Sequence, residues 1–308
     1  MIQSSKVMKK MKFKELPKFW KINIIVLSCI TILLLSGFVA FQSFLNNYRS
    51  QNEIIRANCR KDDSELIGTR LEIPRDNKKS VKVNVYIPKN DNNDKLPVVF
   101  NIHGGGFVGG DADLLDTQSD RIANEWNMIV VAVNYTKADL KPMDYGVEEI
   151  VDTIKYFREH KDDYNLDINK FVVMGYSAGA YYAAKTAISL DKQGIPLIAQ
   201  VLCYPWTNSL TKEKINSTLA PAMFVLASED PISQNSKTYE KALKDNGVTT
   251  YLKEYQGATH SFIESNNPEG SKNITEELEA VINPKQEQLA REAENDIKEW
   301  LIFLMDNN

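Results

Sequence analysis

Ser177 lies between two glycines in the pentapeptide G-Y-S-A-G at residues 175–179, a spacing typical of an activated nucleophile. The apolar run F-V-V-M precedes this motif, and the helix-forming run A-Y-Y-A-A-K-T-A follows it at residues 180–187. These flanks predict a strand, a sharp turn and a helix. The turn needs glycines because larger side chains would collide with the neighbouring strand and helix. The sequence therefore predicts that the serine hydroxyl attacks a carbonyl carbon.

A glycine-rich stretch, H-G-G-G-F at residues 103–107, follows the strand-like run 96–102. Glycines let the backbone approach a reacting carbonyl and leave its N–H groups unshielded. Upstream of a nucleophile motif, this pattern predicts an oxyanion hole. The alternative interpretation is a turn between a strand and a helix with no catalytic task.

The chain has three histidines, and His260 is the one that fits a catalytic base. It lies in the loop G-A-T-H-S-F, just after the strand-like run 249–255, as the chain order Ser, acid, His requires. His103 belongs to the glycine stretch. His160 lies in a charged helix end, F-R-E-H-K-D-D, where a solvated role is expected.

An acid is expected between the serine and the base. Asp230 follows the buried strand predicted at residues 221–228, and the proline after it marks the turn out of that strand. A carboxylate there can orient the imidazole and stabilise its charged form. Glu229 is the competing acid, but neighbours on a strand point in opposite directions.

Four motifs together, H-G-G-G-F, G-x-S-A-G, D-P and H-x-F, resemble the hormone-sensitive-lipase-like branch of the α/β-hydrolases over residues 65–305. The resemblance implies an α/β-hydrolase fold and carboxylic ester hydrolysis without a metal or organic cofactor. It also implies roles for six residues. The nucleophile, acid and base are Ser177, Asp230 and His260, and the oxyanion donors are the N–H groups of Gly105, Gly106 and Ala178.

The chain departs from that branch at four places. Tyr176 precedes the nucleophile where an Asp is usual, and Ala180 replaces a further glycine. The usual Y-R-L-A-P is Y-T-K-A-D at residues 135–139, and D-P-L-x-D is D-P-I-S-Q at residues 230–234. No departure removes a catalytic group, but each weakens any transfer of substrate preference.

The rest of the chain alternates apolar strands with amphipathic helices, which predicts a mostly parallel sheet covered on both faces. Period-2 patterning predicts a hairpin from residues 67–73 and 81–87. The sequence also predicts a strand at 128–133 and helices at 144–160, 234–246 and 285–305. A polar insertion at 265–284 separates the predicted base from the last helix.

Residues 22–45 contain no charged side chain, and a stretch of about 20 apolar residues is enough to span a bilayer. Seven lysines against one glutamate in residues 1–21 predict a cytoplasmic tail and an outer catalytic domain at the cell membrane. We expect a tail at 1–21, a transmembrane anchor at 22–45, a polar juxtamembrane stalk at 46–64 and the hydrolase at 65–308. A cleaved signal peptide is the rival, although the run is long and F-V-A is a poor cleavage site.

Charge supports this division. The first 45 residues hold 7 of the 37 basic and 1 of the 41 acidic side chains, which leaves 30 against 40. Such an acidic domain does not favour nucleic acid or anionic lipid as a partner. Cys59 and Cys203 lie outside the apolar segment and are expected to be free thiols, with a pair left open.

These patterns predict a membrane-anchored serine esterase that acts on small-molecule or polysaccharide-linked esters. Only 53 residues separate the predicted nucleophile from the acid, too few to add a helical cap. An open, shallow site for acetyl-type groups follows, with Phe107, Tyr176 and Trp206 as candidate walls. A serine peptidase of the same fold and a catalytically silent binding domain are the alternatives.

Overall fold

The structure is a computed structural model that describes residues 17–89, 94–266 and 282–307. The chain divides into two units, Met1–Gln51 and Asn52–Asn308. From residue 18 on, the first unit is helical and belongs to α1 (Lys18–Asn58). Its apolar side chains are exposed, and among the described residues it is the one helix long and apolar enough to cross a membrane. A signal sequence near the N-terminus can also be this apolar over such a stretch.

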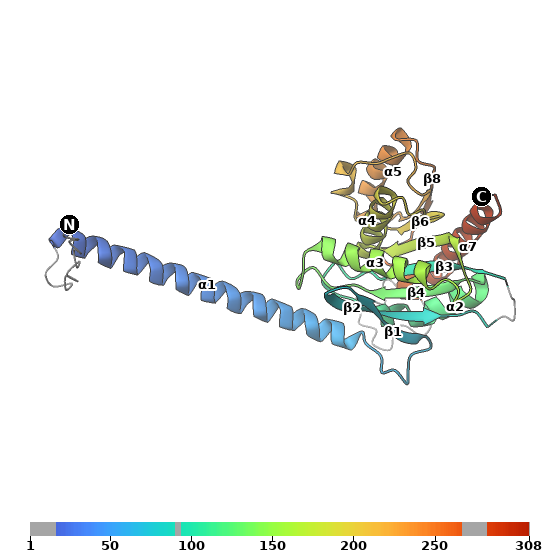
Figure 1. Cartoon of the computed structure of the whole chain (residues 1–308). Coiled ribbons are helices and arrows are strands. Elements are labelled where there is room, and N and C mark those ends of the chain that lie inside the picture. Colours follow the sequence, from blue (N-terminus) through green and yellow to red (C-terminus); the bar gives the residue numbers. More distant parts are fainter. Residues whose placement is uncertain (1–16, 90–93, 267–281, 308) are drawn as a thin grey trace, which may run out of the picture. The chain divides into compact units, whose positions relative to one another are not determined.

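The second unit contains an eight-stranded sheet in the order β1-β2-β4-β3-β5-β6-β7-β8 (Figure 1). The first two pairings, β1 with β2 and β2 with β4, are antiparallel, and all later pairings are parallel. The predicted hairpin and the mostly parallel sheet are therefore confirmed. The strands are β1 (Thr69–Arg75), β2 (Lys78–Tyr86), β3 (Leu96–Ile102), β4 (Ile129–Asn134), β5 (Leu166–Tyr176), β6 (Ala199–Cys203), β7 (Ala222–Ala227) and β8 (Thr250–Tyr255).

Helices cover both faces of the sheet because the strand side chains are apolar on both sides. In β3, Val98 and Phe100 face one core, which α3, α4 and α5 complete, while Val99 faces the other core with α2 and α7. The helices are α2 (Asp116–Trp126), α3 (Met143–Glu159), α4 (Ala178–Lys192), α5 (Ser236–Asp245) and α7 (Pro284–Asn307). Of these, α2 is not among the elements predicted above.

Parallel strands end at a common edge of the sheet, and this edge collects the loops that carry the predicted site. The glycine stretch follows β3, Ser177 follows β5, Asp230 lies three residues beyond β7, and His260 lies five residues beyond β8. Residues 207–220, all described, contain a single regular element, the short 3-10 helix Leu210–Lys212. No helical cap is built from this segment.

The structure corrects the expected stalk. Residues 46–58 continue α1 as a helix, and Asn52 and Arg56 are buried. The guanidinium of Arg56 donates to the carbonyl oxygen of Val108 at 2.7 Å and to the carboxylate of Asp139 at 3.0 Å. The catalytic unit thus starts at Asn52 and not at residue 65, because its loops need these polar partners.

Two smaller expectations concern the polar insertion and the thiols. Most of the insertion at 265–284 falls on residues 267–281, which lie outside the described residues. Cys29, Cys59 and Cys203 are all free, as expected for the last two. Cys203 is buried, and the thiol of Cys59 donates to the carbonyl oxygen of Ile55 at 3.3 Å.

Candidate active site

Ser177 occupies a strained turn between β5 and α4. Its φ is 53° and its ψ is −117°, a backbone conformation that side-chain-bearing residues rarely adopt. Its N–H donates to the carbonyl oxygen of Cys203 at 2.9 Å. A Cβ at Gly175 would lie 2.3 Å from the carbonyl oxygen of Gly179, and one at Gly179 would lie 2.2 Å from that of Ile102. Both glycines are required sterically, as the motif predicts.

The serine, the histidine and the aspartate meet at the edge of the sheet. The Oγ of Ser177 is 2.9 Å from Nε2 of His260, and Nδ1 of the same ring is 2.7 Å from Oδ2 of Asp230. Because the carboxylate only accepts, Nδ1 carries the proton and Nε2 is left to accept from the serine hydroxyl. This tautomer is the one that a general base needs.

Asp230 is buried and held by three donors. Besides the imidazole, the hydroxyl of Ser233 donates to Oδ2 at 2.8 Å, and the N–H of Ile232 donates to Oδ1 at 2.9 Å. Burial alone would raise the pKa of Asp230, but the hydrogen bond and charge of His260 outweigh it and lower that pKa. Glu229, the competing acid, is exposed and bonds to Ser228 instead. Sequence reasoning did not single out Ser233.

The same hydrogen-bonded pair shifts the pKa of His260 in the opposite direction. Burial of the ring disfavours its charged form, but the hydrogen bond and the charge of Asp230 outweigh this effect. The pKa of His260 is therefore raised above its ordinary value. An imidazole with a raised pKa is a stronger base toward the serine proton.

The glycine stretch lies directly against the nucleophile. A Cβ placed on Gly104 would lie 3.6 Å from the Cβ of Ser177. Gly105 and Gly106 are exposed and have φ angles of 124° and 56°. Ala178 is the first residue of α4, where a backbone N–H has no acceptor within the helix and the helix dipole is positive. The structure brings all three predicted donors to the carboxyl edge beside the serine.

The predicted walls divide into two groups. The rings of Phe107 and Trp206 are half-buried, with centroids 5.4 Å apart, and both pack edge-to-face with Tyr181. Tyr176 is different and corrects the expectation: its side chain is 1% exposed and packs in the core near Tyr204. Strand alternation explains this, because residue 176 ends β5 with its side chain on the face that α2 and α7 cover.

Glu264 is a site residue that sequence reasoning missed. It accepts a hydrogen bond from the hydroxyl of Tyr204, whose ring lies 5.2 Å from that of His260. Burial is the main cause that raises the pKa of Glu264. Its position four residues after the histidine was the available signal. Among the described residues, no group of three or more His, Cys, Asp or Glu side chains is placed to hold a metal ion.

Comparison with known proteins places this geometry in a family. A profile described as the α/β-hydrolase fold matches residues 99–218 and 208–264, together more than half of the chain. The chain is 35% identical over 137 residues to the esterase LipI of Mycobacterium tuberculosis, covering 43% of this chain and 42% of that protein. It is 25% identical over 210 residues to an acetyl esterase of Salmonella dublin, covering 54% and 65%.

The solved structure of an esterase from Pyrobaculum calidifontis has the same fold. It superposes with a TM-score of 0.65 over 84% of this chain and 92% of that one, at 23% identity. This chain spans less than two thirds of the length of each of the two sequence relatives above. The profile match, the sheet order and the turn at Ser177 agree, and the chain belongs to the α/β-hydrolase fold family.

Proposed function

We propose that this protein is a serine esterase that hydrolyses short-chain, acetyl-type carboxylic esters. The observation that carries the proposal is the continuous hydrogen-bonded line from Ser177 Oγ through His260 to Asp230, at 2.9 and 2.7 Å. The esterases among its relatives support the same reaction class. The substrate is a small-molecule ester or an ester carried by a polysaccharide.

This geometry supports the following roles in the reaction. Ser177 Oγ attacks the ester carbonyl while Nε2 of His260 takes its proton, and Asp230 stabilises the imidazolium that forms. The N–H groups of Gly105, Gly106 and Ala178 stabilise the oxyanion. The imidazolium then protonates the leaving alcohol, and an acyl-enzyme remains. Water, activated by the same imidazole, attacks this ester and restores the serine.

The acyl group is proposed to lie against Phe107, the last residue of the glycine stretch, and Trp206, which form a half-buried aromatic pair. Residues 207–220 supply no helical cap over this edge. Each methylene gains about 0.8 kcal/mol only when it is buried, and an uncovered site buries few. These features favour acetyl and propionyl groups over long chains.

We also propose that the enzyme is anchored in the cell membrane, with its catalytic domain outside. The apolar part of α1 is long enough to span a bilayer, and seven lysines against one glutamate in residues 1–21 favour a cytoplasmic N-terminus. An anchored chain stays with membranes through alkaline washing. A mature N-terminus beginning beyond residue 36, found in the medium, would instead establish a cleaved signal sequence.

The test of the esterase proposal is Ser177→Ala assayed on a chromogenic acetate. Loss of the nucleophile lowers kcat by about 10⁴-fold or more in such triads. Ser209→Ala is the matched control, because its hydroxyl lies 3.5 Å from that of Tyr181 and outside the triad. A fluorophosphonate probe should label the wild type and not Ser177→Ala. Retention of more than a few per cent of activity would place the nucleophile elsewhere.

The substrate series separates the competing functions. Hydrolysis of acetate esters with little action on matched anilides supports an esterase, whereas efficient amide cleavage would favour the serine peptidase. A protein that binds neither probe nor ester, although folded, would be a silent binding domain.

A further inference from the structure

Lys137 is a buried lysine with no assigned role, and its side chain is 3% exposed. Its ammonium has three donors, and each finds an acceptor. Nζ is 3.0 Å from Nε2 of His103, 2.8 Å from Oδ1 of Asn134 and 2.7 Å from the carbonyl oxygen of Tyr135. It also lies 4.3 Å from the centre of the Tyr135 ring, a cation–π distance. A buried ammonium whose three donors are all bonded holds its hydrogen-bond partners in defined positions.

The group it touches is the first residue of the glycine stretch. Nδ1 of His103 is 2.6 Å from the carbonyl oxygen of Gly104. A carbonyl only accepts, so Nδ1 carries the proton and Nε2 accepts from Lys137. Burial, and then the lysine charge, lower the pKa of His103 well below its usual range, which keeps the ring neutral. The ring also stacks on Tyr135 with centroids 4.4 Å apart.

The anchored carbonyl determines the direction of a proposed oxyanion donor. The peptide between Gly104 and Gly105 is planar and trans, so its N–H points opposite to its C=O. Fixing the Gly104 oxygen on His103 therefore fixes the N–H of Gly105. Gly110 packs closely behind this bond, since a Cβ there would lie 2.4 Å from the same oxygen.

The next peptide, between Gly105 and Gly106, is held by a backbone hydrogen bond and not by a charged side chain. The carbonyl oxygen of Gly105 accepts from the N–H of Gly109 at 2.7 Å, which fixes the N–H of Gly106 by the same rule. The two donors in the glycine stretch therefore have different supports. One is held within the loop, and the other depends on Lys137, which lies 34 residues from the histidine it bonds.

We propose that Lys137 is a positioning residue of the oxyanion hole: its ammonium, acting through His103, holds the Gly105 N–H toward the reacting oxygen. The proposal rests on the proposed esterase function. Lys137 does not contact the substrate, and it is one of the positions at which Y-T-K-A-D departs from the usual Y-R-L-A-P.

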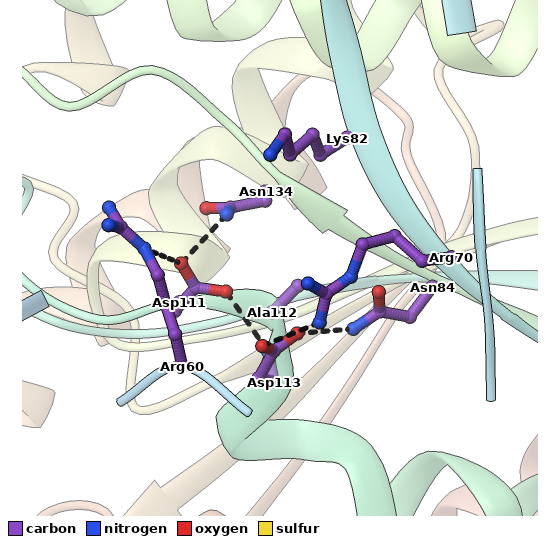
Figure 2. Close-up of a pocket in the computed structure, with 8 residues that line it drawn as sticks. All are labelled: Arg60, Arg70, Lys82, Asn84, Asp111, Ala112, Asp113 and Asn134. Atoms are coloured by element: carbon purple, nitrogen blue, oxygen red, sulfur yellow. Dashed lines mark hydrogen bonds and ion pairs between the residues drawn. The ribbon is translucent and has the colours of Figure 1, made fainter. Parts of the chain in front are cut away.

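Charged groups surround this ammonium on several elements. Asp111 precedes the 3-10 helix Ala112–Leu115, and Figure 2 shows it bonded to both Asn134 and Arg60. Arg56, which precedes Arg60 by four residues, also faces the ammonium, as does Glu149 of α3. Asp139, which pairs with Arg56, belongs to the same segment as Lys137.

The balance of these groups lowers the pKa of Lys137 to about 7. Burial is the largest cause, and the carboxylate of Asp111 opposes it. The ammonium is present below this pKa. As the pH rises through it, the nitrogen loses one of its three donors, and the hold on the loop weakens. We therefore expect kcat to decline at alkaline pH because Lys137 loses a proton, and not because the triad changes.

The variant that tests this is Lys137→Met, which keeps the length of the side chain and removes its charge and donors. We expect kcat for a chromogenic acetate to fall roughly 10- to 100-fold with little change in KM, because a misaligned donor affects the transition state. The alkaline decline should disappear as well. Lys141→Met, the same change at an exposed position four residues on, should keep the wild-type kcat and profile. A wild-type kcat and profile in Lys137→Met would overturn the proposal.

A second measurement needs no variant of the lysine. The chain has three histidines, so ¹⁵N-histidine NMR of the wild type resolves each ring, and His160→Gln with His260→Gln assigns them. We expect the proton of His103 on Nδ1, and an Nε2 signal that shifts as Lys137 titrates. A proton on Nε2, or a signal unchanged from pH 5 to 9, would exclude the bond even if Lys137→Met failed to fold.

The two proposals fail in different ways. If wild-type protein hydrolyses no ester and takes no fluorophosphonate label, the esterase function fails, while the NMR signal still reports the bond. If wild type is active and Ser177→Ala is not, yet Lys137→Met behaves as wild type, only the positioning role fails.

Discussion

The turn at Ser177 and the glycine stretch at residues 103–107 lie side by side, but the glycine stretch depends on buried side chains that the turn does not need. The turn is fixed by contact: Gly175 and Gly179 leave no room for a side chain against neighbouring backbone. The glycine stretch has tight contacts too, since a Cβ at Gly105 would lie 2.4 Å from the carbonyl oxygen of Gly109, but it also depends on hydrogen bonds made by the buried side chains of His103 and Lys137. Added atoms should therefore disturb both halves of the site, whereas removal of the Lys137 proton should disturb only the glycine stretch.

Among changes that leave the triad residues in place, the largest effect is expected from adding one methyl group to the turn. Gly179→Ala places a Cβ 2.2 Å from the carbonyl oxygen of Ile102 and 2.5 Å from that of His103, both backbone atoms that cannot yield cheaply. We expect kcat/KM for a chromogenic acetate to fall by more than about 10²-fold, because the nucleophile is displaced. The melting temperature should fall too.

The matched control lies two residues after the glycine stretch. Gly109→Ala brings a Cβ to 3.2 Å from the Gly105 carbonyl oxygen and keeps the N–H that bonds it. Its activity should stay within a few-fold of wild type, as measured by the same assay and by thermal unfolding. Equal losses in Gly179→Ala and Gly109→Ala would remove the distinction between contact and hydrogen bonding.

The second effect is the fall in kcat/KM at acid pH. At neutral pH this loss is smaller than that expected for Gly179→Ala. His260 acts as a base only when it is neutral, and Asp230 raises its pKa above the ordinary value near 6.5. The value of kcat/KM should fall about tenfold per pH unit below that pKa. Hydrolysis under non-saturating substrate, measured from pH 5 to 8, checks this. A flat profile over that range would contradict the role of the histidine, whatever happens at the alkaline end.

The smallest effect concerns the acyl chain. Phe107 and Trp206 offer limited apolar surface, and residues 207–220 add no helical cover. We expect kcat/KM to peak at acetyl or propionyl and to decline by a few-fold from butyryl to octanoyl, without activation at a lipid interface. Each methylene that is buried would add about 0.8 kcal/mol, or roughly fourfold. A profile that rises through octanoate would show that the site is covered.

The contrast between the two halves also explains what the sequence could predict. The nucleophile turn, the glycine stretch, the hairpin and the mostly parallel sheet follow from local patterns, and the pair Asp230 and His260 follows from chain order. Lys137 does not, because its partner His103 lies 34 residues away and its own segment reads as an irregular loop. Tyr176 was wrongly expected to line the site, because the sequence around it does not indicate on which face of the sheet its side chain lies. The stalk was misread because polar residues that bond to buried carboxylates look the same as solvated ones.

The corrected start of the catalytic unit decides where the chain can be cut. Residues 56–61 form three ion pairs with the catalytic unit's carboxylates: Arg56 with Asp139, Arg60 with Asp111 and the Nζ of Lys61 with Asp116. All three carboxylates are buried, and a buried charge that loses its partner is strongly destabilising. Under the proposed anchoring, a cut before Asn52 leaves all three ion pairs in the catalytic unit, whereas a cut after Lys61 separates them from it and should inactivate the enzyme. The position of a cut, before or after these three pairs, thus decides whether the activity is kept or lost.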